Sequence, residues 1–176
     1  MKTYVALFRG INVGGNNILP MKDLVKLLEG MGFKEVKTYI QSGNAVFKCA
    51  SFKIDKTAKE ISQKIFNSYG FTSTVLVLEI SDIQEAIENN PFKTTEGKAL
   101  HFFFLESIPA NPDLKALQEI KLKTEEFKLI KKIFYIYAPD GIGKSKLASI
   151  VEKKLGVPAT GRNWNTVSKL VEMASD

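Results

Sequence analysis

The chain has 176 residues, of which 44% are apolar and 25% are charged, a composition that suits one substantial hydrophobic core or two modest ones and does not fit a disordered chain. No apolar stretch reaches the roughly 18 residues of a membrane span, and the N-terminus lacks a signal-peptide pattern, so we expect a cytoplasmic protein without a membrane partner. The formal net charge is +6, and residues 1–80 carry the excess, with 11 basic and 6 acidic side chains. This excess favours an anionic partner, although a lysine-rich surface also serves solubility.

Hydrophobic periodicity in the first half predicts the order βαββαβ. Ser42-Gly43 indicates a two-residue hairpin, and the strand Thr74–Leu78 is apolar on both faces, as a buried strand would be. The order is typical of the ferredoxin-like fold, an antiparallel sheet with both helices on one face. In chain order we expect a strand over Tyr4–Phe8, a helix that Pro20 opens and Gly30 ends, strands over Val36–Gln41 and Asn44–Lys48, a helix from Ile54 to near Gly70, and the strand Thr74–Leu78.

The second half repeats most of this pattern after a linking helix. The predicted fold class is α+β, with two ferredoxin-like halves, residues 1–80 and 81–176, each with an antiparallel sheet, and a C-terminal helix. The expected elements are helix Ser81–Asn89, strand Ala99–Leu105, helix Pro112–Ile120, strands Phe127–Ile130 and Ile133–Tyr137, helix Ser145–Leu155, a last strand near Pro158–Gly161, and a terminal helix carrying Val167, Leu170, Val171 and Ala174.

Two residue types that often carry chemistry occur only once. Cys49 is the single cysteine, so the chain has neither an internal disulfide nor a thiolate metal cage. His101 is the single histidine and lies in an apolar run typical of a buried strand, which predicts a structural role. We therefore expect no metal and no cofactor.

The choice of basic residue is informative, because the chain has 23 lysines but only two arginines, Arg9 and Arg162. Arginine offers a planar fork for bidentate pairing that lysine lacks, so we expect Arg162 to make a fork-type contact to an anion, a carboxylate or a carbonyl. Both arginines adjoin Gly- and Asn-rich segments. Four such segments are richer in special polar residues than packing requires: 9–17, 38–44, 140–146 and 159–166.

Taken together, the four segments resemble those of an uncharacterised bacterial family, domain of unknown function 1697, over essentially the whole chain. The matching motifs are R-G-I-N-V-G-G at Arg9–Gly15, T-Y-I-Q-S-G-N at Thr38–Asn44, G-I-G-x-S-K-L at Gly141–Leu147 and T-x-R-N-W-x-T-V at Thr160–Val167. The resemblance implies two ferredoxin-like halves and brings no established activity, substrate or catalytic residue. Gly161 departs from the family pattern, where Ala or Thr is expected.

Each segment has a functional and a structural interpretation. Gly14-Gly15 would let consecutive backbone N–H groups point at an anion near a helix start, or would simply permit positive φ in a turn.

The stretch 138–145 approaches a phosphate-binding P-loop, but Pro139 has no N–H and Asp140 is negative where phosphates would lie, so we predict that the protein is not a P-loop ATPase. Lys144 and Ser145 are left at a plain helix N-terminus with weak anion affinity.

The aromatic residues of two segments are equally ambiguous. Trp164 and Tyr39 are typical of either core packing or a stacking platform. Asn163, Asn165 and Thr166 suit either a polar ligand or the cap of the terminal helix, and capping by itself explains Asn165 or Thr166. The candidate ligand-binding residues are Arg9, Asn12, Gly14, Gly15, Asn16, Tyr39, Ser42, Asn44, Lys144, Ser145, Arg162, Asn163 and Trp164.

Three functions remain open from the sequence. The leading hypothesis is a binding protein for an anionic polar ligand, either a nucleic acid or a phosphorylated metabolite. The second is an enzyme with a polar cleft between the halves. For either function we expect the Arg9 loop and the Arg162 segment to face a shared cleft. The third is a structural or partner-binding scaffold, in which the four segments only fix turns. The sequence assigns no catalytic residue and no oligomeric state.

Overall fold

A computed structural model describes residues 1–50, 54–93 and 95–175. The chain forms two compact units, Met1–Gln84 with the chain from Lys169 onward, and Glu85–Ser168. The terminal helix thus contributes to both units. Within the described ranges, every helix is too short or too polar to cross a bilayer.

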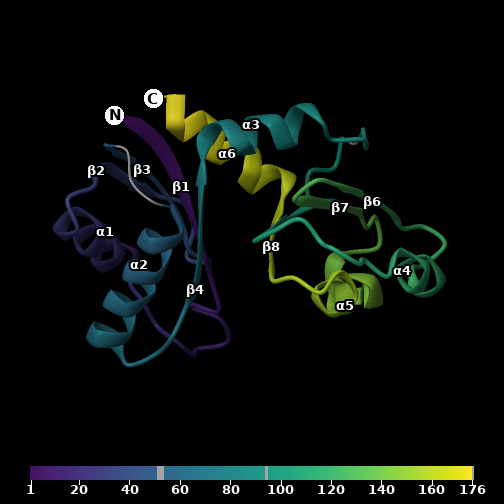
Figure 1. Cartoon of the computed structure of the whole chain (residues 1–176), viewed down its shortest axis with the longest axis horizontal. Helices are drawn as coiled ribbons and strands as arrows, with labels where there is room; N and C mark the ends of the chain where they lie inside the picture. Colours follow the sequence, from purple (N-terminus) through teal and green to yellow (C-terminus); the bar gives the residue numbers. More distant parts are fainter. Residues whose placement is uncertain (51–53, 94, 176) are drawn as a thin grey trace. The chain divides into compact units, whose positions relative to one another are not determined.

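The first unit is a four-stranded antiparallel sheet in the order β2-β3-β1-β4. This order, with one helix after β1 and one after β3, is the ferredoxin-like topology that the sequence predicts. Figure 1 shows both helices on the same face of the sheet. The elements are β1 (Lys2–Arg9), α1 (Met21–Gly30), β2 (Lys34–Thr38), β3 (Asn44–Cys49), α2 (Ile54–Tyr69) and β4 (Thr74–Glu79).

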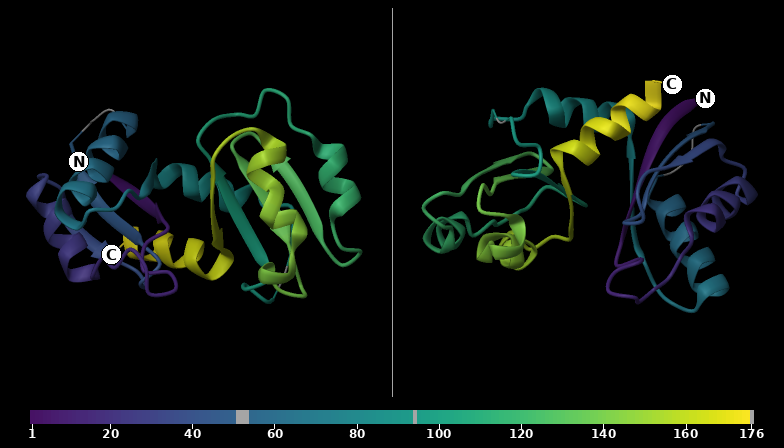
Figure 2. Two further views of the ribbon diagram at one scale, coloured as in Figure 1. Left: turned by 90° about the horizontal axis from the view of Figure 1, so that it is seen from below. Right: turned by 180° about the vertical axis from the view of Figure 1, so that it is seen from behind.

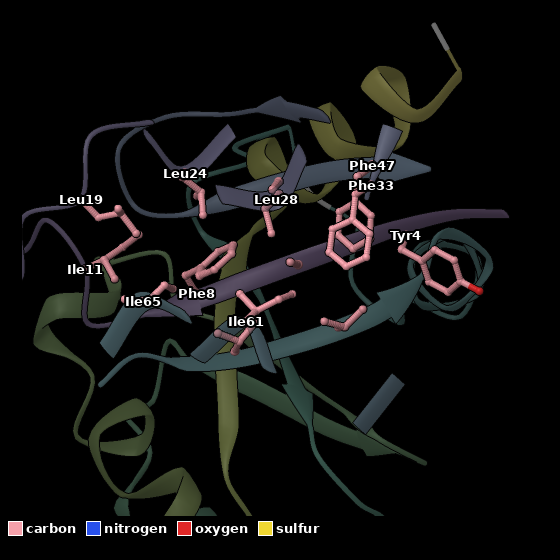
Figure 3. Close-up of a cluster of buried hydrophobic side chains, with 14 residues drawn as sticks. Tyr4, Phe8, Ile11, Leu19, Leu24, Leu28, Phe33, Phe47, Ile61 and Ile65 are labelled. Atoms are coloured by element: carbon pink, nitrogen blue, oxygen red, sulfur yellow. The ribbon is translucent and has the colours of Figure 1, made fainter. Parts of the chain in front are cut away.

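The core of the first unit lies between the sheet and these two helices (Figure 3). Apolar residues of α1 and α2 recur at helical spacing and meet the alternate residues of β1 that point to the same face. The rings of Phe33 and Phe47 stack with their centroids 4.5 Å apart. The fully buried residues of this cluster include Tyr4, Ala6, Phe8, Leu24, Leu28, Phe47, Ile61 and Ile65.

Two predictions for this unit were wrong in detail. β4 lies at the edge of the sheet and is not buried on both faces, because Val75 and Val77 are buried while Leu76 and Leu78 are half-buried. The β2–β3 connection spans 39–43 and is longer than a two-residue hairpin. Its backbone turns at two left-handed positions, Ile40 and Gly43, and the last residue pair before the turn is Thr38 with Ala45.

The second unit repeats the same topology, with the strand order β6-β7-β5-β8 and every pairing antiparallel. Figure 2 shows α4 and α5 over one face of this sheet. The last strand, Ala159–Asn163, begins one residue later and ends two residues later than expected. The elements are α3 (Ile80–Glu88), β5 (Leu100–Leu105), α4 (Leu114–Ile120), β6 (Glu126–Ile130), β7 (Ile133–Tyr137), η1 (Ile142–Lys144), α5 (Lys146–Leu155), β8 (Ala159–Asn163) and α6 (Trp164–Ser175).

Both faces of the second sheet are packed. On one face, Phe134 and Ile136 of β7 join Leu117 of α4 and Val151 of α5. On the other face, Tyr135 is fully buried, and its hydroxyl donates a 2.7 Å hydrogen bond to the carbonyl of Ala86 in α3. Burial, with the negative charge of Glu85, raises the pKa of Tyr135 to about 12, so this hydroxyl remains a hydrogen-bond donor throughout the physiological pH range.

His101 occupies the structural position that the sequence predicts. It lies in the central strand β5 with 8% of its surface exposed, and its Nε2 is 2.9 Å from the carbonyl oxygen of Lys98. A carbonyl only accepts, so Nε2 carries the proton. Burial lowers the pKa of His101, and the hydrogen bond to Lys98 opposes this only in part.

The lowered pKa predicts how acid affects the protein. The unfolded chain binds a proton at His101 more readily than the folded chain, so the contribution of neutral His101 to stability is present above pH 6.5 and is lost as the pH falls through the folded pKa. Because the chain has one histidine, a single imidazole resonance in an NMR titration reports this group. We expect a midpoint below 6.5, and a midpoint at or above 6.5 would contradict the burial argument.

Candidate functional site

The four special segments are distributed two to a unit. In the first unit, Leu7 pairs with Asn44, so the loop after β1 and the β2–β3 loop meet at one edge of the sheet. In the second unit, Tyr137 pairs with Leu100 and Asn163 with His101, so the ends of β7 and β8 both lie beside the start of β5. Within each unit, the predicted segments are therefore brought together.

The side chain of Asn12 joins the two loops of the first unit. Its Nδ2 donates to the carbonyls of Leu19 and Gln41, each at 2.9 Å, and its Oδ1 accepts from the Leu19 amide at 2.8 Å. The backbone N–H of Asn12 also donates to the backbone carbonyl of Asn17 at 3.0 Å. An internal hydrogen bond contributes about 0.5–1.5 kcal/mol, so these bonds together hold the loop in one conformation.

Gly14 and Gly15 form the tip of a small hairpin within the first loop. Both have positive φ, and the Asn16 amide donates to the Val13 carbonyl at 3.0 Å across the turn. The tip lies well before Met21, where α1 begins. This geometry supports the structural interpretation of the two glycines, which is that they supply positive φ in a tight turn.

Asn44 and Gly43 hold the second loop. Asn44 is fully buried, and its Nδ2 donates to the Tyr39 carbonyl at 3.0 Å and to Ser42 Oγ at 3.3 Å. The Gly43 carbonyl accepts from the Phe8 amide at 2.9 Å. A Cβ on Gly43 would lie 2.6 Å from Ile11 Cδ1 and 2.7 Å from Phe8 Cβ, so only glycine fits between the loop and β1.

We call residues 10–19 and 39–43 the loop platform. None of these residues is charged, in a chain that is 25% charged. The platform instead exposes three large aliphatic side chains, Val13, Ile18 and Ile40. Arg9, half-buried at the end of β1, precedes the platform, and its carbonyl accepts from Ser73 Oγ at 2.9 Å.

Ile40 is the unusual member of the platform. Its φ is +49°, in the left-handed region that β-branched residues rarely occupy, and 50% of its surface is exposed. Neither the backbone nor the burial of the side chain favours isoleucine here. Strained positions of this kind concentrate at functional sites.

Sequence reasoning missed the exposed aliphatic residues. It selected Asn12, Asn16 and Asn44 for their polar side chains, and the structure gives all three hydrogen bonds to the loops themselves. The available signal was Val13 inside a Gly- and Asn-rich segment, where it belongs to no helical or strand period; Ile40 gave no such signal, because the sequence places it in a strand over Val36–Gln41 that in the structure ends at Thr38.

The P-loop-like stretch of the second unit is closed by its own hydrogen bonds. The amides of Gly141, Lys144 and Ser145 donate to the carbonyls of Ala138, Gly141 and Ile142, and Ser145 Oγ caps α5 by accepting from the Ala148 amide at 3.0 Å. These three amides are unavailable to a phosphate. Lys144 is exposed beside them.

The last segment combines a helix cap with packing. Asn163 Oδ1 accepts from the Thr166 backbone amide at 3.0 Å, so Asn163 is the cap of α6 among the three residues that the sequence offered for this role. Trp164 packs against Phe102, with centroids 5.9 Å apart. Arg162 Nη1 donates to the neighbouring carbonyl of Gly161 at 2.9 Å, and its fork-type contact stays a prediction.

Gly161, the departure from the family pattern, has a local explanation. It lies opposite Phe103 in the β5–β8 ladder, and a Cβ at Gly161 would be 2.9 Å from Phe103 Cε1. The Phe103 ring therefore takes the space of the missing side chain. The backbone of β8 stays a regular strand here.

Among the described residues, no three His, Cys, Asp or Glu side chains gather where they would hold a metal ion.

The close fit of Gly43 predicts a large effect of one methyl group. Gly43→Ala adds a Cβ against Ile11 and Phe8 at a positive φ, and we expect the free energy of unfolding to fall by about 2–4 kcal/mol. Gly15→Ala is the control, because its φ is also positive but its Cβ has open space, and about 1 kcal/mol is expected. Equal losses of unfolding free energy in Gly43→Ala and Gly15→Ala, measured by urea unfolding, would show that the packing around Gly43 is unimportant.

Comparisons with known proteins agree with the fold. A solved structure of a conserved bacterial protein from Streptococcus pneumoniae is similar, with 27% sequence identity, alignment over 98% of each chain and a TM-score of 0.74. None of the curated proteins matches this chain. The family model described as protein of unknown function DUF1697 matches residues 1–135. The chain belongs to this family, whose function is unknown.

Proposed function

We propose that the protein is a binding module that engages a partner protein through the loop platform of its first unit. The observation that carries the proposal is Ile40, a strained and half-exposed β-branched residue on a loop that Asn12, Gly43 and Asn44 hold in place. Fixing such a residue costs stability, and a binding role accounts for that cost.

The composition of the platform supports a protein partner. The cores of protein interfaces are depleted in charged residues, and antibody binding loops are rich in Tyr, Ser, Gly and Asn. The platform has this composition, with aliphatic side chains at Val13, Ile18 and Ile40 as anchors. Its internal hydrogen bonds reduce the entropy lost on binding.

The net positive charge of the first half indicates what the partner offers. Residues 1–80 carry 11 basic and 6 acidic side chains, and Arg9 lies next to the platform. The partner therefore has an apolar patch to meet the platform and acidic residues around it, an arrangement that speeds association and sets orientation.

The two other hypotheses from the sequence have less support. A nucleic acid would need lysine or arginine on the platform to neutralise phosphates, and the platform has none. No observation among the described residues favours a particular reaction.

We also propose that the protein works in the cytoplasm, where its single cysteine stays reduced.

The strain at Ile40 is testable without a partner. Asparagine tolerates the left-handed region, so Ile40→Asn should raise the free energy of unfolding by about 1 kcal/mol. Ile18→Asn is the control, because Ile18 is similarly exposed but has no positive φ, and its effect should stay within about 0.5 kcal/mol. A loss of stability in Ile40→Asn, measured by urea unfolding, would remove the strain argument.

Binding is tested by photo-crosslinking in the producing cell. A photoreactive amino acid is placed at Ile40 or at Phe66, an apolar α2 residue outside the platform with 48% exposure. We expect a discrete protein adduct only from position 40. That protein is then identified, purified and titrated calorimetrically against the wild type, Ile40→Asn and Phe66→Asn.

The calorimetry decides the proposal. Ile40→Asn should weaken binding at least tenfold, and Phe66→Asn should leave it unchanged. Equal affinities for the three proteins, or crosslinks to nucleic acid in place of protein, would contradict the proposed function.

A further inference from the structure

A second surface of the first unit has the features of a small-molecule site, independently of the loop platform. A depression of about 360 Å³ opens between α1 and α2, which lie side by side on one face of the sheet (Figure 1). Its size falls within the usual range of ligand pockets. The lining residues are Asp23, Lys26, Leu27, Gly30, Met31, Lys64, Ser68 and Tyr69.

Two lysines of this depression are available to a ligand. Lys26 on α1 and Lys64 on α2 are exposed, and neither has a hydrogen-bond or ion-pair partner among the described residues. Lys56 on α2, in contrast, forms an ion pair with Glu60 at 3.5 Å. The depression thus presents two ammonium groups, one from each helix.

Asp23 is the one acidic residue in the lining. Burial raises the pKa of Tyr69, and the nearby carboxylate of Asp23 adds to this shift. The two lysines outnumber this carboxylate, and the Ser68 hydroxyl adds a further polar group for a ligand. The lining keeps a net positive charge.

One wall of the depression is apolar. Leu27 of α1 and Met31, which directly follows this helix, are half-buried and pack against the core of the first unit. Methionine adapts to flat or irregular apolar ligands. A ligand held at the lysines would thus contact an apolar surface with its uncharged part.

We infer that this depression binds a small phosphate monoester, with its phosphoryl group between Lys26 and Lys64 and its uncharged part against Leu27 and Met31. Lysine ammonium groups are strongly attracted to phosphate dianions and accept many approach geometries, so two of them from different helices suit a phosphoryl group. The site lies on different residues from those of the loop platform, so either proposal stands without the other.

The test uses adenosine monophosphate as the probe and adenosine as the control ligand, with binding measured by calorimetry at low salt. We expect adenosine monophosphate to bind and adenosine to bind at least tenfold more weakly. The double variant Lys26→Gln/Lys64→Gln should weaken binding of adenosine monophosphate at least tenfold.

A matched double variant separates the site from general electrostatics. Lys22→Gln/Lys59→Gln removes the same charge from the same two helices at exposed positions that do not line the depression. We expect it to bind adenosine monophosphate within about twofold of the wild type, since screened charges outside a site contribute little. Absent binding, equal losses in the two double variants, or equal affinities for the two ligands would each overturn the inference.

Discussion

The hydrogen bonds of the Asn12 side chain are the constraint on which the candidate site depends. They join the loop after β1 to the β2–β3 loop through the carbonyl of Gln41, and they close the first loop on itself at Leu19. Without them, residues 10–19 would be a long connection with a large conformational entropy. With them, the aliphatic residues Val13 and Ile40 are presented at fixed positions beside the sheet.

The two units share one topology but place their special segments at different strands. Both have the ferredoxin-like strand order, yet the special segments of the first unit follow β1 and β2, whereas those of the second unit follow β7 and include β8. In the second unit, Ser145 and Asn163 cap helices and Trp164 packs against Phe102. Most of these polar residues therefore stabilise the fold, and the platform of the first unit differs because it leaves aliphatic side chains exposed.

The sequence was sufficient for the element order and the topology, because apolar residues recur with clear helical and strand periods in both halves. It was not sufficient for the site. The same asparagine side chains that suit a polar ligand also suit loop closure, and only the structure shows that Asn12 and Asn44 bond to backbone carbonyls. The left-handed backbone of Ile40 and the close fit of Gly43 against Phe8 and Ile11 depend on how the loop meets β1, which no local pattern reports. The position of β4 at the edge of the sheet is equally a product of strand pairing.

The central claim is that the platform is rigid before any partner binds. Amide hydrogen exchange, resolved by NMR, tests it at Asn12, Leu19 and Tyr39, whose N–H groups all donate within or next to the platform. We predict that these amides exchange at least about 100-fold more slowly than in an unstructured chain, which corresponds to an opening free energy of about 2.7 kcal/mol. Exchange at the unstructured rate at all three amides would show that the loops are not held in place, and would contradict the account.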